Sequence, residues 1–376
     1  IADSSLFELD EVIDGNTVDL RVSRTSLANV GDLSGIIVNT GGPFDAMVSD
    51  RSNGLGSGSC GLAGDGWCFN RFAANEPGAT QVMTDATPDD PFAWLRTGYR
   101  KEGETAVWGR AIGVWGETNG DGGNAGSEFE VVGAIAGIDH VFTPVLMAGL
   151  AAQWTTTEID FVGRRDNADV DSFEAGAYAS WGDTRLYLNA NASVIWHSIE
   201  VNRFSPTGRA LGEYDGITYS VFAEVGKTFE TEEGTRIQPF LSLSYSHLDT
   251  NGYSEIGTAT LLNVSDSSFD SLKSTIGARI AFPIELESGR KMVPEFRLAW
   301  AHEFMDDQAS FTATIQGQPP APSVIRGERF ARDTAVVGGG LTLPLSESSS
   351  LFVDYDANVN TDITSHTVSA GIRVTW

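Results

Sequence analysis

The final stretch of the chain, residues 366–376, alternates between apolar and polar side chains. Its apolar positions, which share one face of an extended strand, are Val368, Ala370, Ile372, Val374 and Trp376. The opposite face holds small groups and one arginine, Arg373. A tilted strand of a transmembrane β-barrel needs about 10 residues with one apolar face, and this stretch provides them. An edge strand of a soluble sandwich shows the same alternation, so this stretch alone leaves both folds open.

Similar alternating segments recur through the last two thirds of the chain, with turn signals between them. The predicted strands begin near Ala106, Phe129, Val145, Asp171, Arg185, Ile217, Arg236, Asp270, Met292, Arg332, Ser350 and His366. An even number of strands is the rule for single-chain bacterial outer-membrane barrels. The sequence therefore predicts an all-β fold, a transmembrane antiparallel β-barrel of about twelve strands.

Charged residues in these segments gather on one face of each strand. Glu295 and Arg297, for example, oppose Leu298 and Trp300. A Lys or Arg that faces lipid at the midplane costs about 2–4 kcal/mol, so we expect the charged face to look into the lumen and to hold water or a polar plug. The expected lumen-facing residues are Arg110, Glu174, Glu224, Arg279, Glu295, Arg297, Asp354 and Arg373. The first two strands fit least well, because glycine occurs on both of their faces.

The connections between the predicted strands alternate between short and long, which is the outer-membrane pattern. The long ones are expected at residues 161–171, 202–216, 250–268 and 305–329. Aromatic residues near strand ends could form girdles at the two membrane interfaces. The candidates are Trp115, Trp154, Trp181, Trp196, Tyr245 and Trp300.

The first 105 residues follow other patterns. Residues 1–26 contain an alternating strand after an Asp-Gly-Asn turn. Residues 43–51 predict a short helix with proline in its first turn. Cys60 and Cys68 flank a Gly-rich loop and favour a local disulfide in an oxidising compartment, although free thiols or half a metal site fit the same spacing. A zinc site would need further Cys or His nearby.

Composition narrows the class of protein. The formal net charge is −27, which argues against a nucleic-acid partner and favours acidic loops on a barrel or general solubility. The longest apolar run, residues 131–138, falls short of the roughly 18 residues that a membrane helix requires. The chain begins at Ile1 without the pattern of a signal peptide, so we expect a processed protein or a fragment.

Several stretches resemble the C-terminal translocator domain of monomeric autotransporters, the type Va secretion family. They are VWGRAIGVWGETNGDGG from Val107, residues 311–340, SLFVDYDANVN from Ser350 and TVSAGIRVTW from Thr367. The resemblance implies a barrel over residues 106–376 in the outer membrane of a Gram-negative bacterium. Residues 1–26 resemble the end of a passenger's β-helical stem, exposed at the cell surface. Residues 27–105 occupy the place of the linker that threads and plugs the pore.

The resemblance also implies a function and partners. The chain would export and anchor its own N-terminal passenger. Its partners would be outer-membrane lipid and lipopolysaccharide, periplasmic chaperones and the barrel-assembly machinery. The last strand fits the family's assembly signal, carried here by Ser369, Gly371, Val374 and Trp376. No cofactor, metal or catalytic residue is implied.

Two other functions stay open, a porin-like channel and an outer-membrane hydrolase. The five histidines lack metal-ligand spacing, and no G-x-S-x-G motif occurs. Outer-membrane proteases use acidic pairs near the barrel rim, and Asp306-Asp307 and Asp89-Asp90 are such pairs. Acidic pairs are common in solvated loops, so we favour that interpretation and predict that the chain is not an enzyme.

Overall fold

The computed structural model describes residues 7–14, 17–24, 103–120, 125–143, 145–182, 186–205, 208–231, 235–286, 291–305, 308–346 and 349–376. Within these ranges every regular element is a β-strand. They contain no helix that is long and apolar enough to span a membrane. The predicted helix at 43–51, the pair Cys60 and Cys68, and both acidic pairs lie outside the described residues.

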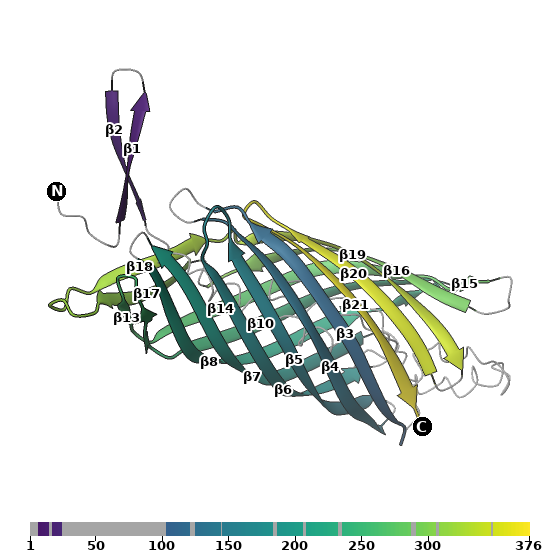
Figure 1. The fold of residues 1–376 in the computed structure, drawn as a ribbon. Coiled ribbons are helices and arrows are strands. Elements are labelled where there is room, and N and C mark those ends of the chain that lie inside the picture. Colours follow the sequence, from purple (N-terminus) through teal and green to yellow (C-terminus); the bar gives the residue numbers. More distant parts are fainter. Residues whose placement is uncertain are drawn as a thin grey trace, which may run out of the picture.

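Twelve long strands of the described chain form one closed antiparallel barrel (Figure 1). They are β3 (Thr105–Thr118), β4 (Ser127–Thr143), β5 (Leu146–Phe161), β6 (Asn167–Gly182), β7 (Leu186–Ser205), β8 (Gly208–Lys227), β10 (Arg236–Thr250), β14 (Ser267–Ala281), β16 (Lys291–Glu303), β19 (Asp333–Ser346), β20 (Ser349–Val359) and β21 (Ile363–Thr375). Each pairs with the next, and β21 pairs with β3 to close the cylinder. The prediction of a twelve-stranded barrel is confirmed.

The last residue of the chain takes part in this closure. The backbone amide of Trp376 donates to the carbonyl of Thr105 at 3.0 Å, and the amide of Thr105 donates to the carbonyl of Trp376 at 3.1 Å. Pairing between β21 and β3 therefore continues to the end of the chain. The alternation of residues 366–376 is explained by this position, because a seam strand needs one face for lipid and one for the interior.

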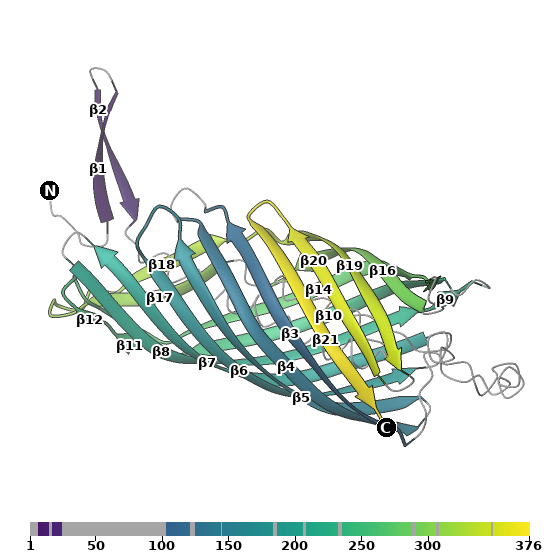
Figure 2. The same ribbon diagram turned by 45° about the vertical axis from the view of Figure 1, so that its right-hand side comes forward.

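The barrel has two unlike ends. At the end where β3 begins and β21 finishes, which we call the turn end, the connections are short, and two add the short strands β9 (Phe229–Glu230) and β15 (Ile284–Glu285). At the opposite loop end, residues 251–266 and 304–332 form long connections. Figures 1 and 2 show the C-terminus and the strands of these long connections at opposite ends.

Two of the four expected long loops are wrong. β5 runs to Phe161 and β6 begins at Asn167, while β7 and β8 reach Ser205 and Gly208 as one long hairpin. The outward positions near these strand ends are charged or polar, so the pattern of apolar outward residues stops before the backbone pairing does. Glu200 of β7 pairs with Glu213 of β8 in regular register, for example. Strands that extend beyond the lipid no longer need an apolar face.

Side chains alternate around the wall as lipid on one side requires. On β16, Leu298 is 65% exposed, whereas its neighbour Arg297 is 3% exposed. Every aromatic residue expected in a girdle is on the exposed face: Trp115, Trp154, Trp181, Trp196, Tyr245 and Trp300. Lipid exposure of these faces agrees with barrels whose outward aromatic residues sit at the interfaces.

Several interior aromatic rings lie over a glycine on the neighbouring strand. Register places the ring and the glycine directly opposite each other in the pairs Trp108–Gly137, Tyr178–Gly149, Tyr187–Gly226, Phe240–Gly277 and Phe352–Gly371. A Cβ at each glycine would collide with the ring. Such pairs cover the bare glycine backbone and help to pin the register. They explain inward-facing glycines such as Gly137 in the strands that fit the sequence pattern least.

The long connections at the loop end fold into a second, four-stranded sheet. Its strands are β11 (Tyr253–Ser254), β13 (Leu262–Val264), β17 (Gln308–Ile315) and β18 (Ser323–Arg329), and β12 (Ile256–Gly257) pairs with β8. Tyr253 stacks on Tyr214 of β8, with ring centroids 4.7 Å apart. Burial, together with Tyr214 and Glu255, raises the pKa of the Tyr253 hydroxyl well above its usual value. The ring therefore packs as a neutral phenol.

One buried ion pair fastens this loop sheet to the long hairpin. Arg203 of β7 donates from Nε to Glu255 Oε1 at 2.9 Å and from Nη2 to Glu255 Oε2 at 2.6 Å. Arg203 also donates to the carbonyl of Thr260, and Glu255 accepts the amide of Leu262 at 2.9 Å. Bidentate geometry and the additional hydrogen bonds satisfy both charges, as a buried pair requires. The remaining described strands, β1 (Phe7–Asp14) and β2 (Thr17–Arg24), pair as a separate hairpin.

Replacing Arg203 with Met should detach the loop sheet without unfolding the barrel. Glu255 would then be buried without its cation, so we expect residues 251–266 to exchange amide hydrogens and to be cleaved by protease faster than in the parent. The matched control is Arg209→Met, because Arg209 is an exposed cation on the same hairpin that donates to Asn202. Equal protection of residues 251–266 in both variants would contradict the role of the ion pair.

Candidate functional site

The interior of the barrel contains an ion pair between two strands that are not neighbours. Arg279 of β14 donates from Nη1 to Glu224 Oε1 at 2.9 Å and from Nη2 to Glu224 Oε2 at 2.6 Å. Glu224 lies on β8, and both strands pair with β10. Each of the two residues is 1% exposed. The pair therefore crosses over β10 on the inside of the wall.

The ring of Phe240 and the hydroxyl of Tyr187 also contact this ion pair. The guanidinium of Arg279 lies 3.8 Å from the ring centroid of Phe240, the residue of β10 that lies beneath it. Arg279 also donates to the hydroxyl of Tyr187 at 3.0 Å, and that hydroxyl donates to Glu224 at 3.1 Å. The three polar groups thus form a closed ring of hydrogen bonds. Such satisfaction is what allows ionised groups to remain buried.

A second pair crosses over β19 at a glycine. Register places Arg297 of β16 opposite Gly338, and Gly338 opposite Asp356 of β20. Arg297 donates to Asp356 above this glycine, and both side chains are fully buried. A Cβ at Gly338 would overlap the Asp356 carboxylate and lie 2.7 Å from Arg297 Nη2. The pair therefore depends on the absence of a side chain at position 338.

A third pair crosses over β21. Arg110 of β3 lies 3.6 Å from the carboxylate of Asp354 on β20. Its guanidinium is 4.4 Å from the ring centroid of Phe352, and that ring covers Gly371. Glu295 acts electrostatically on Arg279, and Arg110 and Arg279 both act on Asp356. The charge cluster, as we call it below, consists of Arg110, Arg279, Arg297, Glu224, Glu295, Asp354 and Asp356.

The structure gathers six of the eight charged residues expected from the sequence into this cluster. Glu174 is 1% exposed on β6, and Arg373 lies 3.9 Å from Glu104 near the turn end. Asp356 and Tyr187 are absent from the expected set. Asp356 alternates with Tyr355 on the same face as Asp354, so the periodicity could have found it. Tyr187 depends on cross-strand register, which the sequence does not reveal.

Residues with the potential for catalysis are arranged differently. Within the described ranges, the hydrogen-bond partners of the buried His197 are the hydroxyls of Ser172 and Thr218, at 2.8 and 2.9 Å. A Ser-His-Asp arrangement would need a carboxylate in one of those places. Across the same ranges, no three His, Cys, Asp or Glu side chains are grouped so that they could hold a metal ion. The interior geometry that is shown instead is three arginine–carboxylate pairs.

Comparison with known proteins places this barrel in a family. Residues 107–356 match the family model described as "Autotransporter beta-domain", which is more than half of the chain. The chain belongs to this family. The autotransporter β-domain lies in the outer membrane, and the loop end is the end that barrels of this kind turn to the cell exterior.

Relatives and solved structures agree with this assignment. The "Extracellular serine protease" of Serratia marcescens is 23% identical over 280 residues, which cover 73% of this chain and 26% of that protein. "Outer membrane protein B" of Rickettsia conorii is 23% identical over 404 residues, covering 100% of this chain and 24% of that protein. The chain thus spans about a quarter of the length of these relatives.

Two solved translocators share the fold of this autotransporter β-domain. The translocator domain of NalP from Neisseria meningitidis has a TM-score of 0.60 at 15% identity, covering 80% of this chain and 98% of that chain. The beta domain of the Bordetella autotransporter Brka has a TM-score of 0.55 at 18% identity, covering 72% and 99%. At these identities the similarity concerns the fold.

Adding one methyl group at Gly338 should break the second ion pair. In Gly338→Ala the Cβ forces Asp356 and Arg297 apart, and we expect the free energy of unfolding to fall by about 3 kcal/mol, as for other broken buried pairs. Urea unfolding in detergent, followed by tryptophan fluorescence, measures this loss. Gly339→Ala is the matched control, because the nearest atom to its Cβ is the carbonyl oxygen of Glu295 at 3.3 Å. Equal losses in the two variants would exclude the proposed dependence.

Replacing Arg279 alone should lower the free energy of unfolding more than replacing both Arg279 and Glu224. Arg279→Met leaves Glu224 buried and uncompensated, which typically costs about 3–5 kcal/mol. The double variant Arg279→Met/Glu224→Gln removes the stranded charge, so we expect it to be more stable than the single variant. With the single variant Glu224→Gln measured in the same way, the three losses give the coupling between the two sites. Additive losses would show that the two side chains do not act as a pair.

Proposed function

We propose that residues 106–376 anchor the chain in the outer membrane and export the segment that precedes them. The observation that carries the proposal is a closed barrel whose interior holds three ion pairs between strands that are not neighbours. In this proposal residues 1–26 are the end of the exported stem and residues 27–105 form the segment within the pore. The proteins named above as a serine protease and an outer membrane protein are examples of chains that extend far beyond such a barrel.

The mechanism of anchoring follows from backbone chemistry. A closed barrel satisfies its amides and carbonyls between strands, so it can remain in lipid while its interior stays polar. The proposed lumen-facing residues are Arg110, Glu174, Glu224, Arg279, Glu295, Arg297, Asp354 and Arg373. Four of them are arginines and four are carboxylates, so the formal charges of this set cancel. Such a wall suits a polypeptide of mixed charge better than it suits selection of one ion.

The proposal assigns the pore-threading role to the part of residues 27–105 that includes the stretch 43–51, for which the sequence predicts a short helix. A disulfide between Cys60 and Cys68 would close a ring small enough to travel with the extended chain. The passenger's own activity is not assigned. We assign no catalytic role, cofactor or metal to the barrel, and the strongly acidic chain is not expected to bind nucleic acid.

Insertion would depend on the last strand. We propose that periplasmic chaperones deliver the chain and that the barrel-assembly machinery recognises Ser369, Gly371, Val374 and Trp376. Val374 and Trp376 are 40% and 66% exposed on the lipid-facing side, while Ser369 is buried. A recognition element of this kind offers an apolar edge before the seam closes. Outer-membrane lipid and lipopolysaccharide would then surround the exposed wall.

Surface proteolysis tests the export of the N-terminal segment. With an epitope tag placed before Ile1, protease added to intact cells should remove the tag while residues 106–376 remain as a protected fragment. Export requires the tag to lie outside and the folded barrel to resist cleavage. Lysed cells serve as the control for tag cleavage.

Two outcomes would contradict the proposal. Protection of the tag in intact cells, with cleavage after lysis, would show that the segment stays in the periplasm. A large, steady conductance of the full chain in planar bilayers would instead favour the porin-like alternative.

A further inference from the structure

The tips of two neighbouring hairpins at the loop end carry arginines. Residues 162–166 join β5 to β6 and include Arg164 and Arg165, while Arg209 lies at the start of β8, beside the turn that follows β7. Arg165 and Arg209 are exposed, and Arg164 is half-buried. Cations are scarce in a chain whose formal net charge is −27, so their grouping at one place indicates an anionic partner.

An aromatic ring between the two hairpins holds two of these cations. The guanidinium carbon of Arg165 lies 4.8 Å from the ring centroid of Phe204, and that of Arg209 lies 5.8 Å from it. Arg209 also donates from Nε to the side-chain oxygen of Asn202 at 3.0 Å. Among the residues that the structure describes, neither arginine forms an ion pair. Arg165, Phe204 and Arg209, which we call the basic tip, therefore present guanidinium groups that a carboxylate could bind in bidentate fashion.

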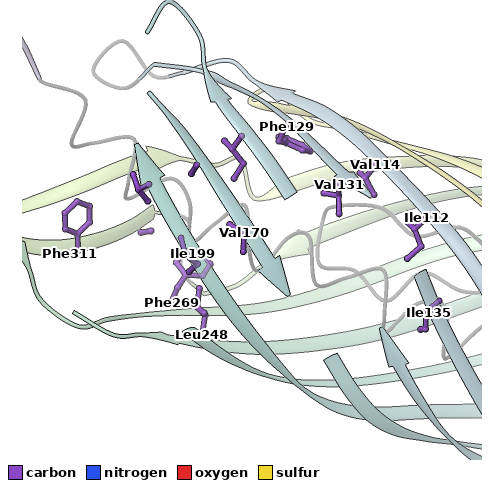
Figure 3. Close-up of a cluster of buried hydrophobic side chains, with 14 of the residues drawn as sticks. Ile112, Val114, Phe129, Val131, Ile135, Val170, Ile199, Leu248, Phe269 and Phe311 are labelled. Atoms are coloured by element: carbon purple, nitrogen blue, oxygen red, sulfur yellow. The ribbon is translucent and has the colours of Figure 1, made fainter. Parts of the chain in front are cut away.

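The basic tip has a rigid support. Asp166 of the β5–β6 turn accepts the backbone amide of Phe204 at 2.7 Å, so the two hairpins are joined at their tips. The buried apolar cluster lies on the inner side of the same strands (Figure 3), and its members there include Val170 and Ile199. The spacing of the two arginines is thus fixed by the folded wall.

Carboxylates lie between the basic tip and the membrane. The outward residues Glu158, Asp169, Glu200 and Glu213 are directly opposed on β5 to β8. Glu200 precedes Phe204 by four residues, roughly 13 Å along an extended strand. An anionic glycolipid of the outer leaflet would have to lie against this row to reach the tip, and repulsion disfavours that position. An anionic segment that lies beyond the rim would meet the arginines first.

The β1–β2 hairpin of the same chain is strongly acidic. β1 contains four carboxylates and no Lys or Arg, at Glu8, Asp10, Glu11 and Asp14. Alternation places Glu8, Asp10 and Asp14 on one face of the hairpin, which we call the acidic face. The register pairs Glu8 with Ser23 and Asp14 with Thr17, so neither has a cation as its cross-strand partner. A two-stranded hairpin is only marginally stable alone in water, so this one needs a support.

We propose that the basic tip docks the acidic face of the β1–β2 hairpin and holds the end of the exported segment at the rim of the barrel. This inference rests on the proposed function, which places residues 1–26 outside the membrane at the loop end. Residues 27–105 tether the hairpin to the barrel, so the contact is intramolecular and benefits from a high effective concentration. Exposed ion pairs are individually weak and screened by salt, so the docking is reversible.

Exchanging the charges in the purified full chain tests the docking. Arg165→Glu with Arg209→Glu should make the amide hydrogens of residues 7–24 exchange several-fold faster than in the parent. Glu8→Arg with Asp14→Arg should have the same effect. The variant with all four changes should regain slow exchange, because its charges are complementary again. Raising the salt from about 0.1 M to about 1 M shortens the Debye length to about 3 Å and should remove the difference between parent and variants.

The matched control is Lys227→Glu at the turn end. The ammonium of Lys227 lies 4.8 Å from the ring centroid of Phe229, so it is a cation on an aromatic ring far from the proposed contact. Exchange in residues 7–24 should stay as in the parent. Equal exchange in the parent and the Arg165→Glu/Arg209→Glu variant would overturn the inference. Failure of the fourfold variant to regain slow exchange, with loss of co-purifying lipopolysaccharide on reversal of the tip, would overturn it in favour of a glycolipid site.

Surface proteolysis separates this inference from the proposed function. An epitope tag placed before Ile1 should be cleaved in intact cells carrying the parent or the Arg165→Glu/Arg209→Glu variant, because export does not require the docking contact. Protection of the tag in both would overturn the proposed function, and the inference with it. A tag that is accessible in both, with equal exchange of residues 7–24, would overturn the docking alone.

Discussion

The rest of the structure depends on one constraint, which is that hydrocarbon offers no hydrogen-bond partner to the backbone. The twelve strands provide every backbone group of the wall with a partner strand only because β21 pairs with β3. This pairing continues to Thr105 and Trp376 (Figures 1 and 2). Once the wall is closed, every second residue must suit lipid and the others must suit an enclosed interior. The exposed Leu298 beside the buried Arg297 is a direct consequence of that division.

Enclosure creates a second problem, because the interior charges have lost most of their water. The barrel resolves it by pairing residues two strands apart across a flat intervening position. Gly338 lies between Arg297 and Asp356, and the ring of Phe240 lies under Arg279. Small residues and aromatic rings on the intervening strands are therefore part of the electrostatics. Directly opposed residues could not achieve this here, since Arg279 lies opposite another cation, Arg297.

The sequence predicts the strands and their lipid-facing sides. It does not predict side-chain contacts that depend on the register between strands. Alternation locates the strands and separates their two faces, because hydrocarbon lies against the outward face along the whole membrane-spanning part of each strand. It fails at the far ends of β7 and β8, where Glu200 and Glu213 face outward beyond the lipid and the strands continue. The partner of Arg297 is not visible in any local pattern, since residues 297 and 356 meet only through the pairings of β19.

Part of the acidic excess of the chain forms one row on the outside of the barrel. On β4 to β8, near the loop end, one outward row of directly opposed residues consists of Glu130, Glu158, Asp169, Glu200 and Glu213. Like charges in opposed positions destabilise a sheet, so folding alone does not account for the row. Carboxylates cannot enter hydrocarbon without a large loss of solvation, and a continuous row of them therefore sets how deep this side of the barrel can sink. Trp154 and Trp196, which face outward on the same strands, prefer the interface itself. The row thus fixes the height and orientation of the barrel in the membrane, although its carboxylates repel one another.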